Sequence, residues 1–237
     1  FFDGDGCVTM RSGTGIIHLN IGQNIDSAHV LLHYRELLGG GISRHRIGTG
    51  KHKATLQWQV SGSKMRHVAA LLGQIPSMKQ AQLKIARGGN REGQCREGIG
   101  EQLFQLKQKD HIAKKLKCTW AYFSGFFDAE GSITVTPLSV GLKLYVKQIN
   151  PFILKRLLEF LHGSELDSWR LEQDQNCAAL LCADLATSKQ TLKHLLDHGL
   201  LVKRKQAQLA LSLNAANHKK VREAVMELNG WQPKYNR

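Results

Sequence analysis

The stretch Trp120-Ala121-Tyr122-Phe123-Ser124-Gly125-Phe126-Phe127-Asp128-Ala129-Glu130-Gly131 decides the fold, because its second half has a copy at the start of the chain, Phe1-Phe2-Asp3-Gly4-Asp5-Gly6. Each copy ends in a carboxylate followed by glycine, and the two copies lie 125 positions apart, from residue 3 to residue 128. A duplicated acidic motif at such a distance indicates two related halves.

Two further matches follow in the same order along the chain. Gln23 and Gln148 are also 125 positions apart, and the pentapeptide Lys-Gln-Ala-Gln-Leu occurs at residues 79–83 and again 126 positions later, at residues 205–209. This period is far longer than that of stacked solenoid repeats. The sequence therefore predicts two homologous domains in one polypeptide.

The composition restricts the partners. The chain has 237 residues, enough for two domains of about 100 residues each, and its 33 Lys and Arg against 19 Asp and Glu give a net charge of +14. Such a charge favours polyanions, because bound phosphates release counterions. No apolar run has membrane-spanning length, so we expect no membrane partner. The five cysteines form no metal-binding spacing and indicate reduced thiols in an intracellular compartment.

Hydrophobic periodicity predicts the same series of elements in each half: helix, two strands, helix, two strands, helix. Ile17, Leu19 and Ile21 alternate with polar residues, which is typical of a strand with one buried face. We therefore predict an α+β fold of two αββαββα repeats, each with an antiparallel sheet. The expected domains are residues 1–86, a linker at 87–117 that is rich in glycine and charge and ends in a charged helix over 101–116, and residues 118–237.

The segment from Trp120 to Gly131 resembles the signature of the LAGLIDADG homing endonucleases, and Phe1 to Gly6 resembles the back half of a first signature. The similarity extends over essentially the whole chain. It implies a single-chain, pseudo-twofold monomer with two saddle-shaped sheets that straddle DNA, packed through the two central motif helices. Because the first copy lacks its upstream helix, we expect about two or more further helical turns before Phe1 in the native protein.

The resemblance also implies a metal-dependent nuclease site. Asp5 and Glu130 would be the catalytic metal ligands, with Gly4 and Ala129 completing the set, whereas Asp3 and Asp128 would be structural acids at the helix ends. Two carboxylates beside phosphate require cations, and Mg²⁺ is suited to one or two carboxylates plus substrate oxygens and water. We expect about two or three Mg²⁺ ions, with Ca²⁺ supporting binding without cleavage.

Accessory residues follow from the same resemblance. Gln23 and Gln148 would orient water, and Lys203 would stabilise phosphate charge. At the position that matches Lys203 the first half has Ser77, which predicts a slower first site unless Lys79 supplies the missing ammonium.

Outward residues of the predicted strands are the candidates for reading bases, since a two-stranded ribbon fits the major groove. In the first half these residues are Thr9, Arg11, His18, Asn20, Arg44, Arg46, Gln57 and Gln59. In the second half they are Thr134, Thr136, Lys143, Tyr145 and Arg170. Five lysines, Lys51, Lys53, Lys114, Lys115 and Lys117, are expected to contact the backbone of DNA or only water.

The leading functional hypothesis is a site-specific double-strand DNA endonuclease, intron-encoded or free-standing. Two alternatives stay open: a maturase that binds group I intron RNA, and a non-cutting nucleic-acid-binding protein of the same fold. Retention of acids in both copies favours the endonuclease. The habit of the resembling family suggests an organelle or an archaeon, and of these we expect an organelle, either mitochondrion or chloroplast.

Overall fold

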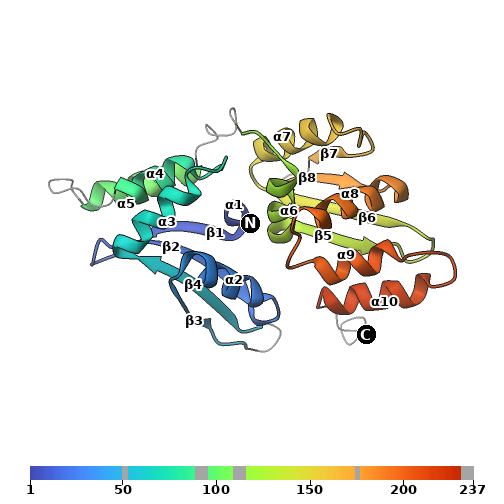
Figure 1. Cartoon of the computed structure of the whole chain (residues 1–237), viewed down its shortest axis with the longest axis horizontal. Helices are drawn as coiled ribbons and strands as arrows, with labels where there is room; N and C mark the ends of the chain where they lie inside the picture. The colour runs from blue at the N-terminus through green and yellow to red at the C-terminus, as the bar shows by residue number, and fades with distance from the viewer. Residues whose placement is uncertain (50–52, 89–95, 109–115, 174–176, 231–237) are drawn as a thin grey trace. The chain divides into compact units, whose positions relative to one another are not determined.

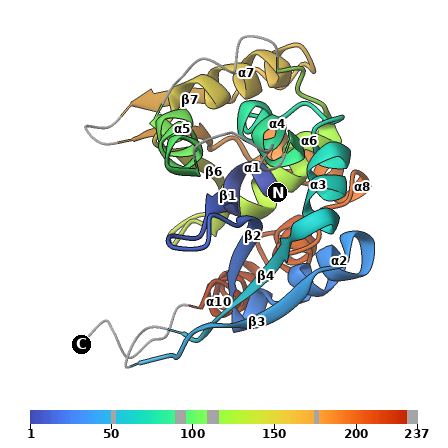
Figure 2. The same ribbon diagram turned by 90° about the vertical axis from the view of Figure 1, so that its left-hand side faces the viewer.

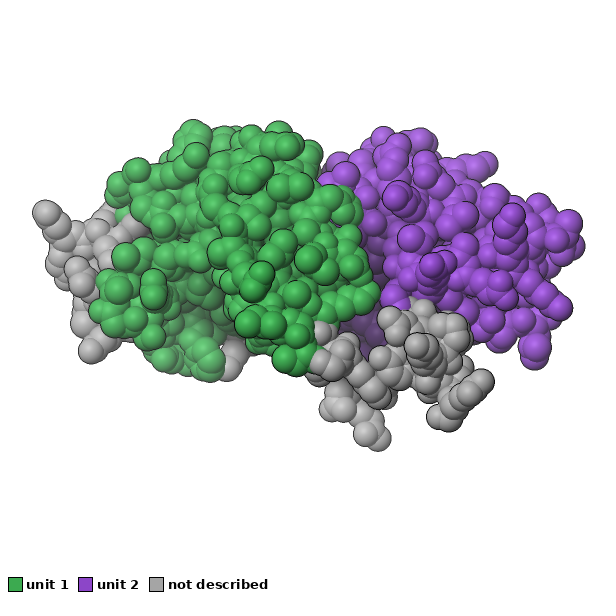
Figure 3. Space-filling model, turned by 90° about the horizontal axis from the view of Figure 1, so that it is seen from below, with its two compact units in different colours: residues 1–117 green, residues 118–237 purple. Residues whose placement is uncertain are grey.

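The computed structural model describes residues 1–49, 53–88, 96–108, 116–173 and 177–230. The chain divides into two compact units, unit 1 with residues 1–117 and unit 2 with residues 118–237, which Figure 3 shows in different colours. None of the helices in the described ranges is long and apolar enough to span a bilayer.

Both units repeat one order of elements (Figure 1). Unit 1 contains α1 (Phe2–Asp5), β1 (Gly6–Met10), β2 (Ile17–Asn24), the 3₁₀ turn η1 (Ile25–Ser27), α2 (His29–Leu38), β3 (Gly41–Arg46), β4 (Thr55–Ser61), α3 (Gly62–Leu72), α4 (Gln80–Gly88) and α5 (Arg96–Gln108). Unit 2 contains α6 (Trp120–Glu130), β5 (Gly131–Val135), β6 (Leu142–Gln148), α7 (Pro151–His162), β7 (Arg170–Gln173), β8 (Ala178–Cys182), α8 (Leu185–Asp197), α9 (Arg204–Leu211) and α10 (His218–Leu228).

Each unit is built on a four-stranded antiparallel sheet. The strand order is β1-β2-β4-β3 in unit 1 and β5-β6-β8-β7 in unit 2. The registers also correspond, since Gly6 pairs with Ile21 in unit 1 and Gly131 pairs with Val146 in unit 2. The predicted α+β class with two antiparallel repeats is confirmed.

One face of each sheet carries the core. Leu19, Ile21 and Trp58 are fully buried in unit 1, where α2, α3 and α4 pack against the strands (Figure 2). Leu144 and Leu180 are fully buried in unit 2, beneath helices α6 to α10. The predicted alternation of buried and exposed residues along the strands is therefore confirmed. The opposite face of each sheet carries mainly polar side chains and is not covered by these core residues.

A buried tryptophan in each unit keeps its indole N–H satisfied. Trp58 donates to the carbonyl of Gly39 at 2.6 Å, and Trp169 donates to the Thr191 hydroxyl at 3.1 Å. Gly39 ends α2 with φ 69°, and Gly40 follows with φ 87°, where an added Cβ would lie 2.6 Å from the carbonyl oxygen of Gln59. Glycine is required at this turn both for its backbone conformation and for the space beside the sheet.

Side-chain caps fix several helix starts. Thr119 accepts from the N–H of Tyr122 at α6, and Asn150 accepts from the N–H of Phe152 at α7. At α8, Asp184 accepts from the N–H of Thr187, so that the helix begins at Leu185.

The described part of the segment between the repeats belongs to unit 1. The helix α5 packs against β1 and α4, and the division between the units falls after Lys117. The helix expected over residues 101–116 begins earlier, at Arg96, and its described part ends at Gln108. Lys51, Lys114 and Lys115 lie outside the described residues.

Candidate functional site

In each unit, the last residue of the motif helix is an acid that faces the amide of one glutamine. Gln23 donates from Nε2 to Oδ2 of Asp5 at 2.5 Å, and Gln148 donates from Nε2 to Oε1 of Glu130 at 3.1 Å. The sheet produces these pairs, because the glycine after each acid pairs with the strand residue two positions before the glutamine. The structure therefore brings together the predicted acid and glutamine of each half.

The glycine after each acid is required by close packing. Gly6 has φ −77° and Gly131 has φ −76°, so neither needs the left-handed region. A Cβ added at Gly6 would lie 2.3 Å from the Phe2 ring, and one added at Gly131 would lie 2.4 Å from the carbonyl oxygen of Phe127. Any side chain here would push the first strand away from the acid-bearing helix end.

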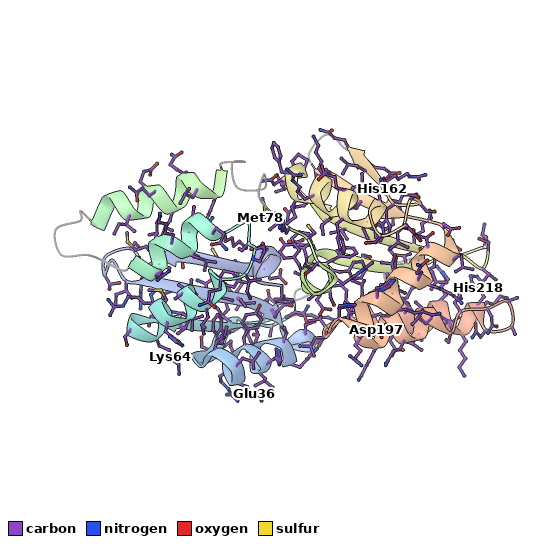
Figure 4. All side chains as sticks on the ribbon, turned by 45° about the horizontal axis from the view of Figure 1, so that its top comes forward. Glu36, Lys64, Met78, His162, Asp197 and His218 are labelled. Atoms are coloured by element: carbon purple, nitrogen blue, oxygen red, sulfur yellow. The ribbon has the colours of Figure 1, made fainter. Side chains whose placement is uncertain are left out.

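The two acids that precede the catalytic positions are held by hydrogen bonds. Asp128 is 4 % exposed, and its two oxygens accept from the backbone N–H groups of Leu201 at 2.6 Å and Lys203 at 2.9 Å. The matched Asp3 accepts from the Ser77 hydroxyl and from the N–H of Met78 at 2.8 Å (Met78 is labelled in Figure 4). These carboxylates connect each acidic motif to the turn before α4 or α9.

Each unit also places a lysine ammonium at the carbonyl ends of its motif helix. Lys203 donates from Nζ to the carbonyl oxygen of Asp128, and Lys79 donates from Nζ to those of Phe2 and Asp3, both at 2.8 Å, and to that of Gly6. A cation there satisfies carbonyls that lack partners inside the helix and interacts favourably with its dipole. The Asp128 and Asp3 carbonyls are matched, so the two ammoniums occupy matched places.

Lys79 and Lys203 are also equivalent in their helices. The carbonyl of Lys79 accepts from the N–H of Leu83 at 2.8 Å, and the carbonyl of Lys203 accepts from that of Ala207 at 2.9 Å, so each lysine immediately precedes its helix. With Lys79 aligned on Lys203, buried Leu83 and Ala86 coincide with buried Ala207 and Ala210.

The repeated pentapeptide is therefore out of phase by two residues between the units. The sequence alignment that placed Ser77 opposite Lys203 is wrong in structural terms, because Ser77 instead donates its hydroxyl to the Asp3 carboxylate. Helical burial is the signal that could have shown this, since residues three apart share a face.

The donor set around each acid suits a hard cation. A carboxylate and neighbouring peptide carbonyls are oxygen ligands, which Mg²⁺ prefers, and this ion keeps several waters and takes phosphate oxygens from its substrate. Among the described residues no group of three or more His, Cys, Asp and Glu side chains gathers. A cation at Asp5 or Glu130 would thus depend on water and on substrate oxygens. Of Gly4 and Ala129, the two residues expected to complete the ligand set, Gly4 has its carbonyl 3.4 Å from Nζ of Lys79.

The sheet registers place most of the base-reading candidates on one polar face. In unit 1, His18 pairs with Thr9 and Asn20 with Gln59, and Asn20 donates from Nδ2 to the Thr9 hydroxyl at 2.8 Å. Gln59 Nε2 contacts His18 Nδ1, and burial, together with the charge of Arg11, lowers the pKa of His18. Several candidates are consequently held in position before any ligand binds.

One candidate, Arg44, lies elsewhere than expected. Arg44 pairs with Leu56, so the expectation that it shares the polar face with Gln57 is wrong. A register shift between Arg44 and Arg46 then returns Arg46 to that face, where it pairs with Thr55.

In unit 2, Thr134 pairs with Lys143, and both lie on the face that carries Tyr145. Thr136 lies beyond the end of β5, and its hydroxyl donates to the carbonyls of Ser139 and Gly141 in the hairpin turn. The Nε of Arg170 donates to Oε1 of Glu172 at 3.0 Å on the exposed edge strand β7.

This architecture is shared with solved nuclease structures. The LAGLIDADG meganuclease I-AabMI bound to uncleaved DNA has a TM-score of 0.70 at 18 % identity, over 97 % of this chain and 96 % of that one. The LAGLIDADG homing endonuclease I-GzeII in complex with its DNA target has a TM-score of 0.68 at 10 % identity, over 100 % and 97 %. The chain has the LAGLIDADG meganuclease fold.

Other meganucleases extend the likeness. I-CpaMI bound to uncleaved DNA has a TM-score of 0.64 at 13 % identity, over 98 % of this chain and 96 % of that one. The sequence matches no protein-family model and no curated protein. At these identities the likeness shows the LAGLIDADG meganuclease fold, and the chemistry has to be argued from the residues.

Proposed function

We propose that this protein is a metal-dependent, site-specific double-strand DNA endonuclease that hydrolyses phosphodiester bonds in a long asymmetric target. One observation carries the proposal: both units retain the same set, an acid that ends the motif helix, a glutamine amide on that acid and a lysine ammonium on the helix carbonyls. A protein that only binds nucleic acid has no need for a carboxylate facing phosphate in each repeat.

Each residue of the set has a distinct task in this proposal. Asp5 and Glu130 would hold Mg²⁺, with Gly4 and Ala129 as further candidate ligands, and each unit would serve one DNA strand. Gln23 and Gln148 fix the orientation of the carboxylates and of the water that attacks phosphorus. When bound, about two or three Mg²⁺ ions would supply an activated water and neutralise the leaving oxygen.

The lysines supply positive charge without a metal. An ammonium at the carbonyl end of each motif helix places a positive charge next to the acidic motif, where it would stabilise the negative charge that develops on a phosphate oxygen. Lys79 takes this role in unit 1 and Lys203 in unit 2. Because both units carry one such ammonium, we expect the two strands to be cut at comparable rates.

The polar faces of the two sheets would read the target in the major groove. Glutamine and asparagine pair with adenine, and arginine pairs with guanine. The net charge of +14 would supply affinity that does not depend on sequence. Unlike residues on the two faces imply unlike half-sites, and a monomer would suffice to read both.

The test is incubation of the chain with a randomised double-stranded DNA library in Mg²⁺, followed by sequencing of the ends. We expect discrete breaks at one long asymmetric sequence, binding without breaks in Ca²⁺, and binding without breaks for the double variant Asp5→Asn, Glu130→Gln. Binding of the unaltered chain without cleavage in Mg²⁺ would show a non-cutting DNA-binding protein. Absence of DNA binding would overturn the proposal and make intron RNA the next ligand.

A further inference from the structure

The two sheets can be compared residue by residue, because their registers coincide. Leu19 pairs with Val60 in unit 1 as Leu144 pairs with Cys182 in unit 2. The polar face then aligns position by position. Asn20, Gly22, Gln59 and Gln57 on the central strands of unit 1 correspond to Tyr145, Lys147, Leu181 and Ala179 of unit 2.

The central strands of this face differ in chemistry between the units. The third strand of the sheet order presents two amides in unit 1, Gln57 and Gln59, and two aliphatic side chains in unit 2, Ala179 and Leu181. An amide can donate and accept toward a base edge, whereas an aliphatic side chain can do neither. The two units therefore cannot discriminate bases in the same way along these strands.

The surroundings of Ala179 leave it accessible. Ala179 pairs with Lys147 on β6 and with Glu172 on β7, both exposed, and is itself partly exposed. Leu181 pairs with Tyr145 and Arg170 and is only 4 % exposed, although it lies on the polar face. Ala179 and Leu181, two positions apart on β8, thus form a short aliphatic strip with charged side chains on the neighbouring strands.

We propose that unit 2 reads the base pairs facing β8 through the 5-methyl groups of thymine, which contact Ala179, whereas unit 1 reads the base pairs facing β4 through hydrogen bonds from Gln57 and Gln59. This inference rests on the proposed binding of DNA. The thymine methyl is the one apolar group that the major groove displays, and alanine is among the side chains that contact it. Exposed Lys147 and Arg170 lie on the neighbouring strands, opposite Ala179 and Leu181 respectively, and are suited to phosphate or guanine.

The size of the effect follows from the chemistry. Burying one methyl group is worth about fourfold in affinity, and losing a bidentate amide contact is worth about tenfold or more. Uracil lacks the methyl of thymine and keeps its hydrogen-bonding groups, and 7-deazaadenine lacks the N7 that an amide requires. These two analogues separate the two modes of reading.

The experiment measures binding of the full chain, in Ca²⁺, to its selected target with one base replaced at a time. The variant Gln57→Ala, Gln59→Ala identifies the half-site of unit 1 by its loss of specificity. We expect uracil for thymine to weaken binding about fourfold in a short stretch of the other half-site and to have no effect opposite β4. We expect 7-deazaadenine to act in the reverse way.

A matched substitution completes the test. Ala179→Gln introduces the residue that unit 1 carries at the same register position. Because Ala179 is partly exposed, the added amide can extend into solvent, and we expect the variant to abolish the uracil effect. Equal affinity for uracil and thymine throughout the half-site of unit 2, or no thymine in that stretch, would overturn this inference alone. Failure to bind any DNA would remove the proposed function as well.

Discussion

Replacing Asp128 with alanine should destabilise unit 2 severely, although this acid is not one of the proposed metal ligands. Its carboxylate is 4 % exposed and accepts two backbone N–H groups, at 2.6 and 2.9 Å. A hydrogen bond to a charged group contributes about 1.5–3 kcal/mol. Two such bonds make the expected loss about 3–6 kcal/mol.

Urea unfolding followed by tryptophan fluorescence measures this loss, because Trp169 is buried within unit 2. With a slope of about 1.5 kcal/mol per molar urea, the midpoint of the unit 2 transition should fall by about 2–4 M. If the alanine variant does not fold, Asp128→Asn is the second measurement. It keeps one acceptor oxygen, and its midpoint should fall by about half as much.

Glu130→Gln is the matched control, since this residue lies two positions further along and accepts one amide bond from Gln148. Its midpoint should shift by less than about 0.7 M, because a single partly exposed bond contributes about 1 kcal/mol or less. The reasoning is refuted if Asp128→Ala unfolds at the midpoint of the unaltered chain, or if Glu130→Gln loses as much stability.

Three other outcomes are expected. Lys79→Met should slow cleavage of one DNA strand, and Lys203→Met should slow cleavage of the other. Each variant should then accumulate nicked circular DNA, with the nick in opposite strands for the two variants, whereas the control Lys205→Met, at an exposed lysine, should not. Equal slowing of both strands by either variant would contradict these roles. The pKa of His18 is lowered by burial and by a neighbouring arginine, so the unfolded chain binds the proton more readily than the folded chain. The free energy of unfolding should therefore be highest above about pH 6.5 and decline as the pH falls below that value. His18→Asn should reduce this decline, measured as urea midpoints over the same pH range. Loss of the α8 cap in Asp184→Ala should cost about 1 kcal/mol, measured as a lower unfolding temperature, and an unchanged temperature would argue against the cap.

The strands and the acidic motifs were predictable because they depend on residues that are close together in the sequence, and the repeat was predictable because matched residues keep a constant spacing. Alternation of Ile17, Leu19 and Ile21 requires only that one face of a strand be buried, and the glycine after each acid marks a helix end. The 125-residue spacing required both halves to form the same fold, and it correctly matched the two acids and the two glutamines.

Other features depend on contacts between distant segments. The two-residue phase shift between α4 and α9 depends on which side chains meet the sheet, and the identical pentapeptide concealed it. The register shift after Arg44 reverses which residues face outward, and a strict period of two cannot show an inserted residue. The pairing of Ala179 opposite Lys147 depends on a ladder between strands 30 residues apart.

By itself, then, the sequence determined two αββαββα repeats, a basic surface and one acid per repeat, because these follow from periodicity, composition and internal duplication. Only the tertiary structure decided that Lys79 and not Ser77 is the counterpart of Lys203. It also decided that the polar faces of the two sheets differ in chemistry along β4 and β8. The physical reason is that the role of a side chain depends on its contacts with residues distant in the sequence, and these contacts are set by the phase of each helix and the register of each strand.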